Sequence, residues 1–189
     1  MRLLLALVAG ALALAGCGQA QAAERCGRHD AVLSADAAAR PLPPLTGHVV
    51  DRAGLLSAQM ERRLVRELEG LEAATTDELV VVTVPSLDGE AIESLGLRLG
   101  NGWGVGKADL DNGVLLIVAP REREARIEVA CGLDGLLADE RAQEIMDTVL
   151  IPHFAGGRFE QGVQAGVAAI GAILRSNRRR PQPWRETPS

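Results

Sequence analysis

The sequence is poor in aromatic residues: two Trp, two Phe and no Tyr make up 2% of its 189 residues. Proteins that bind single-stranded nucleic acid stack bases on aromatic side chains, and this chain has too few for such a platform. It also lacks a surplus of basic residues, since its formal net charge is −5, whereas phosphate backbones are bound by Lys and Arg. We therefore expect no nucleic-acid partner.

The motifs of common hydrolases are missing as well. The chain contains no G-x-S-x-G nucleophile elbow and no H-E-x-x-H zinc motif. Its three histidines, His29, His48 and His153, are isolated in the sequence. A pair formed by Cys131 and His153 is conceivable. The N-terminal segment described next indicates an oxidising compartment, however, and thiols there tend to be oxidised. Nucleophilic catalysis therefore has little support.

An apolar run near the N-terminus is too short to span a membrane. It covers 14 residues, from Leu3 to Gly16, and follows Arg2, which suits a signal peptide, whereas a spanning helix needs about 20 residues. Its end, Leu14-Ala15-Gly16-Cys17, resembles the lipobox of bacterial lipoproteins, and this implies cleavage before Cys17 and acylation of that residue. Gly18 in place of Asp implies, by the same resemblance, sorting to the outer membrane of a Gram-negative host. The alternative is an ordinary secretory signal with a chance cysteine.

Cysteine is scarce, with three residues in the chain. If Cys17 carries lipid, Cys26 and Cys131 remain in an oxidising envelope compartment, where disulfides persist. We expect these two to form a disulfide within the chain, or between two chains if the segment around Cys26 is free. The alternative is that Cys131 is a small buried apolar residue and Cys26 a free thiol.

The composition divides the chain into a signal peptide at 1–16, a lipid-anchored tether at 17–44, a domain at 45–175 and a basic, Pro-rich tail at 176–189. The prolines that end the tether favour an extended chain. Residues 45–174 contain 11 basic and 21 acidic residues, so the domain is strongly acidic and attracts cations. The three consecutive arginines of the tail are expected to be solvated, or alternatively to touch anionic lipid head groups.

The hydrophobic pattern predicts alternating helices and strands. Apolar residues recur every three or four positions in four segments: 57–71, 92–99, 139–152, which Pro152 closes, and 159–174. Continuous apolar runs predict two strands buried on both faces, and an alternating run predicts their hairpin partner, at 79–84, 113–119 and 125–129. A fourth strand could lie at 48–50. Because buried strands need helices on both faces, we expect a three-layer α/β/α sandwich with a short mixed sheet of three or four strands.

Four aspartates are candidate ligands of a divalent cation, calcium or magnesium. The segment 109–113 is not an EF-hand, because Val114 and Pro120 occupy the positions that require Gly and Glu. The glycines at 102, 104 and 106 follow a helix and precede a strand, the reverse of a dinucleotide fingerprint, so they indicate a conformational loop. Carboxylates near strand ends can still bind a cation, and the candidates are Asp51, Asp111, Asp134 and Asp139. The alternatives are turns at Asp111 and Asp134 and a helix N-cap at Asp139.

Several short motifs, taken in order, resemble the TPM domain family over residues 45–174. They are Val49-Val50-Asp51, Leu55-Leu56-Ser57, the run from Leu79 to Leu87, Gly102-Trp103-Gly104-Val105-Gly106, Asp111-Asn112-Gly113-Val114-Leu115-Leu116, Arg126-Ile127-Glu128-Val129, Gly132-Leu133-Asp134-Gly135 and Ile151-Pro152-His153-Phe154. The resemblance implies an α/β/α sandwich on the non-cytoplasmic side of a membrane, bound divalent cations and phosphatase activity in some plant members. The chain departs from the family at Ala130-Cys131 and lacks the C-terminal membrane helix of many bacterial relatives.

Two functions are compatible with these observations. The first is a lipid-anchored, cation-binding module of the envelope that helps to assemble or repair a membrane protein complex. The second is a metal-dependent phosphatase, in which a cation binds phosphate oxygens and activates water. The acidic domain repels anionic substrates unless a metal intervenes, which favours the first.

Overall fold

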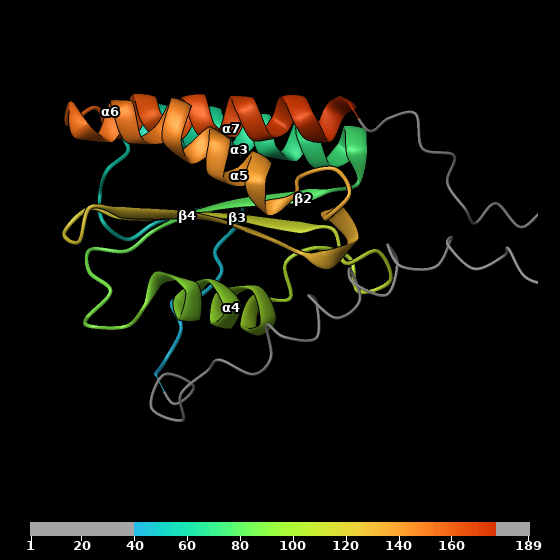
Figure 1. The fold of residues 1–189 in the computed structure, drawn as a ribbon, viewed down its shortest axis with the longest axis horizontal. Helices are drawn as coiled ribbons and strands as arrows, with labels where there is room; N and C mark the ends of the chain where they lie inside the picture. The colour runs from blue at the N-terminus through green and yellow to red at the C-terminus, as the bar shows by residue number, and fades with distance from the viewer. Residues whose placement is uncertain (1–39, 177–189) are drawn as a thin grey trace, which may run out of the picture. The chain divides into compact units, whose positions relative to one another are not determined.

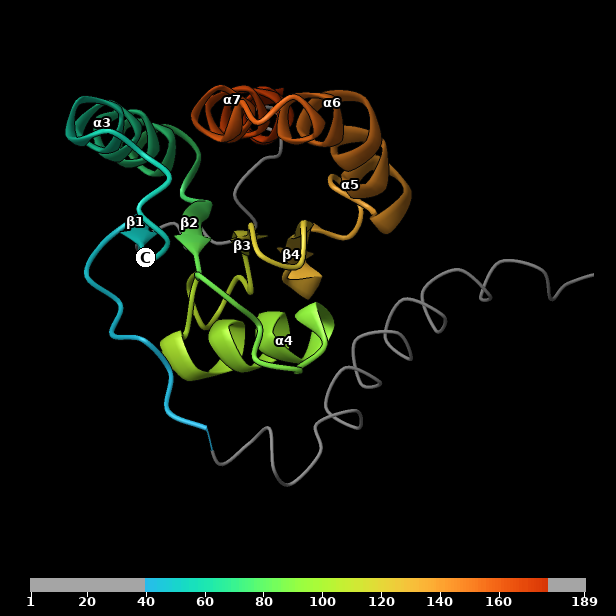
Figure 2. The same ribbon diagram turned by 90° about the vertical axis from the view of Figure 1, so that its left-hand side faces the viewer.

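A computed structural model describes residues 40–176 of the chain. The predicted signal peptide, Cys17, Cys26 and the tail from residue 177 onward lie outside the described residues. Within the described part, a four-stranded sheet separates two layers of helix (Figures 1 and 2). The predicted three-layer α/β/α sandwich with a short mixed sheet is confirmed.

The sheet has the strand order β1-β2-β3-β4. Its strands are β1 (Val49–Asp51), β2 (Glu78–Thr83), β3 (Gly113–Ala119) and β4 (Glu124–Val129). β1, β2 and β3 are parallel, and β4 is antiparallel to β3, which confirms both the predicted hairpin and the fourth strand. Every residue of β3 is buried, as are five of the six residues of β2, because helices cover both faces of these central strands.

One face of the sheet is covered by several helices and the other by one (Figure 2). The first layer contains α3 (Ala58–Thr75), α5 (Asp139–Ile145), the π-helical turn η3 (Met146–Leu150), α6 (Ile151–Ala155) and α7 (Phe159–Ser176). The second layer is α4 (Ile92–Trp103), and a 3-10 turn, η2 (Cys131–Leu133), follows β4. Two apolar cores result, one between the sheet and each layer.

The starts of α3 and α7 are joined by a carboxylate. Ser57 caps α3, because its Oγ accepts a hydrogen bond from the backbone N–H of Met60 at 3.2 Å. Glu160, in the first turn of α7, accepts a hydrogen bond from the backbone N–H of Ser57 at 2.8 Å. The two helices therefore lie side by side with their N-termini together.

The prediction that Pro152 ends the helix begun at Asp139 is wrong. The helical path continues through η3 into α6 and ends at Ala155. Pro152 lies in the first turn of α6, directly after the wider π-helical turn, where a missing N–H donor is tolerated.

Residues 40–44, which the sequence assigns to the tether, lie against α4. Arg98 and Glu90 form an ion pair in which the side chains are 7% and 5% exposed, with Nε 2.8 Å from Oε1. Arg98 Nη1 also donates to the carbonyl of Arg40 at 2.7 Å, and Trp103 Nε1 donates to the carbonyl of Pro43 at 2.9 Å. Two side chains of α4 thus bind the backbone of the incoming segment.

Replacement of Arg98 by Met is expected to destabilise the domain by about 3–5 kcal/mol, because it leaves the Glu90 carboxylate buried and unpaired. The double variant Arg98→Met, Glu90→Leu should recover most of this loss. The measurement is the free energy of unfolding in urea. Arg62, exposed on α3, provides the control: if Arg98→Met cost no more than Arg62→Met, the ion pair would not support the fold.

Candidate functional site

The four candidate aspartates are divided between opposite edges of the sheet. Asp51 ends β1, at the edge where the parallel strands finish. Asp111 precedes β3, at the edge where these strands begin. Because β4 runs antiparallel to β3, Asp134 and Asp139 follow its end on the side of Asp111. A single site containing all four carboxylates is therefore incompatible with the strand directions.

The carboxylate of Asp51 closes the loop between β1 and α3. Its Oδ1 accepts from the backbone N–H of Leu55 at 3.1 Å, and its Oδ2 accepts from that of Leu56 at 2.8 Å. The hydroxyl of Thr83, at the end of β2, also donates to Asp51. Both carboxylate oxygens therefore stabilise the fold at this edge.

The loop before β3 is held by side chain to backbone hydrogen bonds. Asn112, which is 3% exposed, donates from Nδ2 to the carbonyl of Thr76 at 2.8 Å and accepts at Oδ1 from the N–H of Lys107 at 2.8 Å. Gly106 has φ 95°, and a Cβ there would lie 2.5 Å from the backbone nitrogen of Gly113. Gly104 and Gly106, which both have positive φ, are therefore loop positions as predicted, whereas Gly102 lies in the last turn of α4.

Asp111 connects this loop to the segment after β4. It has φ 46°, its Oδ2 accepts from the N–H of Cys131 at 3.1 Å, and its carbonyl accepts from the N–H of Gly132 at 2.8 Å. A Cβ at Gly132 would lie 1.9 Å from the carbonyl oxygen of Leu110, so the two segments approach as closely as glycine allows. The side chain of Asp111 thus joins two segments 20 residues apart instead of closing a turn within its own loop, as the alternative predicted.

The carboxylates do not form a ready-made metal centre. Among residues 40–176, no group of three or more His, Cys, Asp or Glu side chains is arranged to hold a metal ion. Asp139 is exposed as the first residue of α5, and the N-cap is Ala138, so the predicted alternative of Asp139 as N-cap is wrong. Binding of calcium or magnesium at the Asp111 edge stays a prediction, and any ion there would need water or backbone oxygens as further ligands.

In the described part of the chain, His48, His153 and Cys131 form no nucleophilic pair. His48 Nε2 lies 3.0 Å from Oε2 of Glu72, and His153 Nδ1 lies 2.7 Å from the carbonyl oxygen of Val149. Cys131 is disulfide-bonded, so it is not a thiol that His153 could activate. Its predicted partner, Cys26, lies outside the described residues, and this pairing stays a prediction.

Sequence reasoning missed a carboxylate at the edge where the parallel strands finish. Ser86 Oγ donates to Oε1 of Glu122 at 2.7 Å, and this hydrogen bond lowers the pKa of Glu122 against a smaller opposing effect of burial. Backbone N–H groups and the guanidinium of Arg121 lower the pKa further. The pair joins the end of β2 to the β3–β4 turn across 36 residues of sequence, so no local pattern could reveal it.

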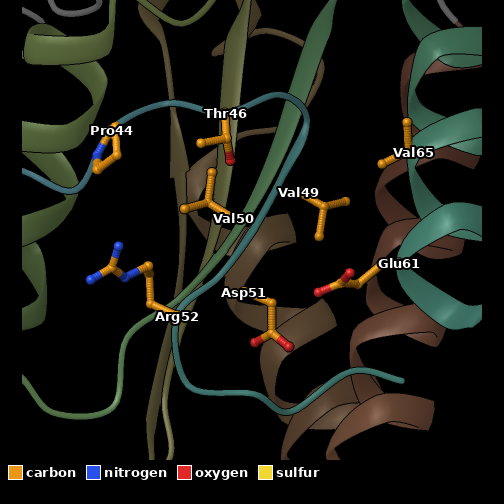
Figure 3. A pocket seen from close by; sticks show the side chains of 8 residues that line it. All are labelled: Pro44, Thr46, Val49, Val50, Asp51, Arg52, Glu61 and Val65. Carbon is orange, nitrogen blue, oxygen red and sulfur yellow. The ribbon is translucent and has the colours of Figure 1, made fainter. Parts of the chain in front are cut away.

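A pocket of about 270 Å³ lies beside the edge strand β1 (Figure 3). Val49 and Asp51 of β1 and Glu61 and Val65 of α3 line it where the strand and the helix lie side by side (Figure 3). Pro44, Thr46, Val50 and Arg52 complete its lining. Asp51 is a candidate from the sequence, but no local pattern predicts the pocket, because its walls combine residues 44–52 with Glu61 and Val65 of α3.

Comparison with solved structures finds related folds, among them three bacterial proteins. The N-terminal domain of a protein from P. gingivalis is 35% identical with a TM-score of 0.65, covering 69% of this chain and 83% of that one. The BA42 protein of the psychrophilic Bizionia argentinensis is 21% identical with a TM-score of 0.56, covering 64% and 82%. The N-terminal domain of the cg2496 protein of Corynebacterium glutamicum is 17% identical with a TM-score of 0.57, covering 76% and 89%. The last two support the fold alone.

A search of curated proteins finds no match. The TPM domain, in contrast, matches residues 49–173, which include every strand and nearly all of the helical layers described above. Some of the motifs that carried the resemblance form the loops at Asp51, Asp111 and Gly132, and others lie in β2, β4 and α6. The chain belongs to the TPM domain family.

Proposed function

We propose that this protein is an accessory binding module of the cell envelope, anchored by lipid at Cys17, which helps to assemble or repair a membrane protein complex. The observation that carries the proposal is that polar side chains of the family motifs are hydrogen-bonded to the backbone of neighbouring loops. Asp51, Asp111 and Asn112 all bind backbone N–H or carbonyl groups of neighbouring loops. Polar groups engaged in this way build a rigid scaffold, and such a scaffold suits recognition of another protein.

A metal-dependent phosphatase is the alternative. It needs a cation that binds phosphate oxygens and an Asp that acts as ligand or base. Asp111 and Asp139 are the residues that would hold the cation, but the 11 basic and 21 acidic residues of the domain oppose the approach of an anionic substrate. The division of the aspartates between two edges also leaves fewer ligands at either one, which favours the binding module.

The localisation is part of the proposal. Within residues 40–176, none of the helices is both long and apolar enough to cross a membrane. We propose that acyl chains on Cys17 hold the protein at the outer membrane, facing the periplasm, and that the chain between Cys17 and residue 40 links the lipid to the domain.

Co-purification tests the proposed function. After mild crosslinking of whole cells, a tagged full-length protein is expected to recover a stoichiometric membrane protein partner. The matched control is a tagged variant in which Cys17→Ser removes the acyl acceptor. Recovery of no partner, together with metal-dependent hydrolysis of p-nitrophenyl phosphate by the purified protein, would decide for the phosphatase.

Lipid anchoring is tested separately. The wild-type protein should remain with membranes after a high-salt wash and carry acyl chains on Cys17, because acyl chains bind through apolar burial, which salt does not weaken. The variant Cys17→Ser should appear in the soluble fraction, as measured by fractionation and mass spectrometry. Acylated, membrane-bound Cys17→Ser protein would contradict the proposal.

Cation binding is tested by thermal unfolding. Calcium or magnesium should raise the melting temperature, because a ligand that binds only the folded state stabilises it. The double variant Asp111→Asn, Asp139→Asn should lose this increment, and Asn suits position 111 because it tolerates a positive φ. Asp147→Asn, on η3 and exposed, is the control. If the cation raised the melting temperature of the double variant as much as that of the wild type, it would bind without these two carboxylates.

A further inference from the structure

Within residues 40–176, β1 presents an open edge whose outward backbone groups have no hydrogen-bond partner. In the described part of the chain it is the outermost strand, next to β2 alone. The carbonyl of His48 accepts from Val81 N–H at 2.8 Å, and Arg52 N–H donates to the carbonyl of Thr83 at 3.0 Å. Because hydrogen bonding alternates along a strand, residues 48, 50 and 52 face β2, and Val49 and Asp51 direct their N–H and C=O groups away from it.

The surface beside this edge combines an apolar and an acidic part. Val49 packs toward the core under α3, whereas Val50 belongs to the core over α4. Val49 and Asp51 therefore share the face of the sheet that α3 covers, with Val65 and Glu61 of that helix also lining the pocket (Figure 3). Asp51 is already bonded to the loop that follows it, which leaves Glu61 as the carboxylate available to an incoming group.

An exposed apolar side chain extends the same surface. Leu45 is 39% exposed and is one of two large hydrophobic residues exposed in the described part of the chain. It lies between Pro44 and Thr46, which both line the pocket. The apolar surface thus continues from the pocket onto the segment that leads into β1.

We propose that the open edge of β1 binds an extended peptide segment of a partner protein by strand addition. The peptide would pair with the free N–H and C=O groups of Val49 and Asp51. An apolar side chain would lie against Val49 and Val65, and a Lys or Arg two residues away would lie beside Glu61, since alternate residues of a strand face the same side. This inference rests on the proposed function and specifies how the module recognises its partner.

The negative charge of the domain favours a basic peptide over a second copy of the chain as the partner at β1. The domain carries 11 basic and 21 acidic residues between positions 45 and 174, so two copies meeting at β1 would repel each other. A basic peptide is attracted by the same charge. β1 has three residues, so main-chain pairing is short and side-chain contacts at Val65 and Glu61 have to provide much of the specificity.

The test uses the full-length protein and a fluorescein-labelled heptapeptide, Gly-Thr-Val-Thr-Lys-Thr-Gly, with binding measured by fluorescence anisotropy. Its Val-x-Lys spacing matches the apolar and acidic parts of the edge. A second peptide, with Glu in place of Lys, reports the contribution of charge. The wild type is expected to bind the Lys peptide about tenfold more tightly than the Glu peptide.

Val49→Pro tests the backbone pairing. Proline removes the outward N–H of residue 49 without removing a hydrogen bond to β2. Val49→Ala is the matched control, since it shortens the side chain but keeps the N–H. We expect Val49→Pro to weaken binding of the Lys peptide about five- to tenfold beyond the effect of Val49→Ala, the loss of about one hydrogen bond. Thermal unfolding verifies that both variants fold.

Glu61→Lys tests the acidic contact independently of the backbone. This variant should reverse the preference, so that the Glu peptide binds more tightly than the Lys peptide. Glu144→Lys, an exposed change of equal charge on α5, should leave the preference unchanged. Absence of peptide binding by the wild type, or a wild-type preference in Glu61→Lys, would overturn the proposal.

The outcomes also separate this inference from the proposed function. Co-purification of a partner that is retained equally by Val49→Pro and Glu61→Lys would support the binding module and reject β1 as its contact. Peptide binding with the expected variant effects, but without any partner in cells, would support the β1 site and reject the proposed function.

Discussion

Burial of β2 and β3 on both faces is the constraint on which the structure depends. Ten apolar residues of these strands are less than 2% exposed, and each large apolar side chain removed from water stabilises the fold by about 1.5–3 kcal/mol. A sheet of this kind cannot leave either face open, so α4 must cover one side and α3 and α7 the other. The polar residues of β2, Glu78 and Thr83, are confined to the ends of that strand, next to the loops of the TPM motifs, and β3 contains none.

Strand direction explains why Asp51 and Asp111 lie at opposite ends of the parallel strands. The chain enters β1, β2 and β3 from one edge and leaves them at the other, and β4 returns it to the first. Asp51 consequently closes a loop at the exit edge, whereas Asp111 binds the segment after β4 at the entry edge. Asp51 and Asp111, which the sequence suggests as ligands of one kind of cation, thus stabilise different loops at opposite ends of the strands.

The sequence was sufficient for features governed by local pattern. Ser57 could be identified as a helix cap, and the runs at β2, β3 and β4 could be identified as strands, because hydrophobic periodicity and capping depend on neighbouring residues. Pro152 was misjudged because the π-helical turn before it depends on packing against α7, where a Cβ at Gly166 would lie 2.7 Å from Leu150. The Ser86–Glu122 contact could not be predicted, since it joins residues 36 positions apart, and the β1 pocket depends on how the segment before α3 packs beside that helix.

The contact between Ser57 and Glu160 has a consequence for how the chain folds. The first long helix of the domain is completed by a side chain from its last helix, 103 residues later. Val163, Val167, Ile170 and Leu174 of α7 also fill the core beneath the first layer. The native state therefore requires contacts of high sequence separation, which slow folding because the intervening chain must be ordered first. A nascent chain would keep its apolar segments exposed until its C-terminal part has been synthesised.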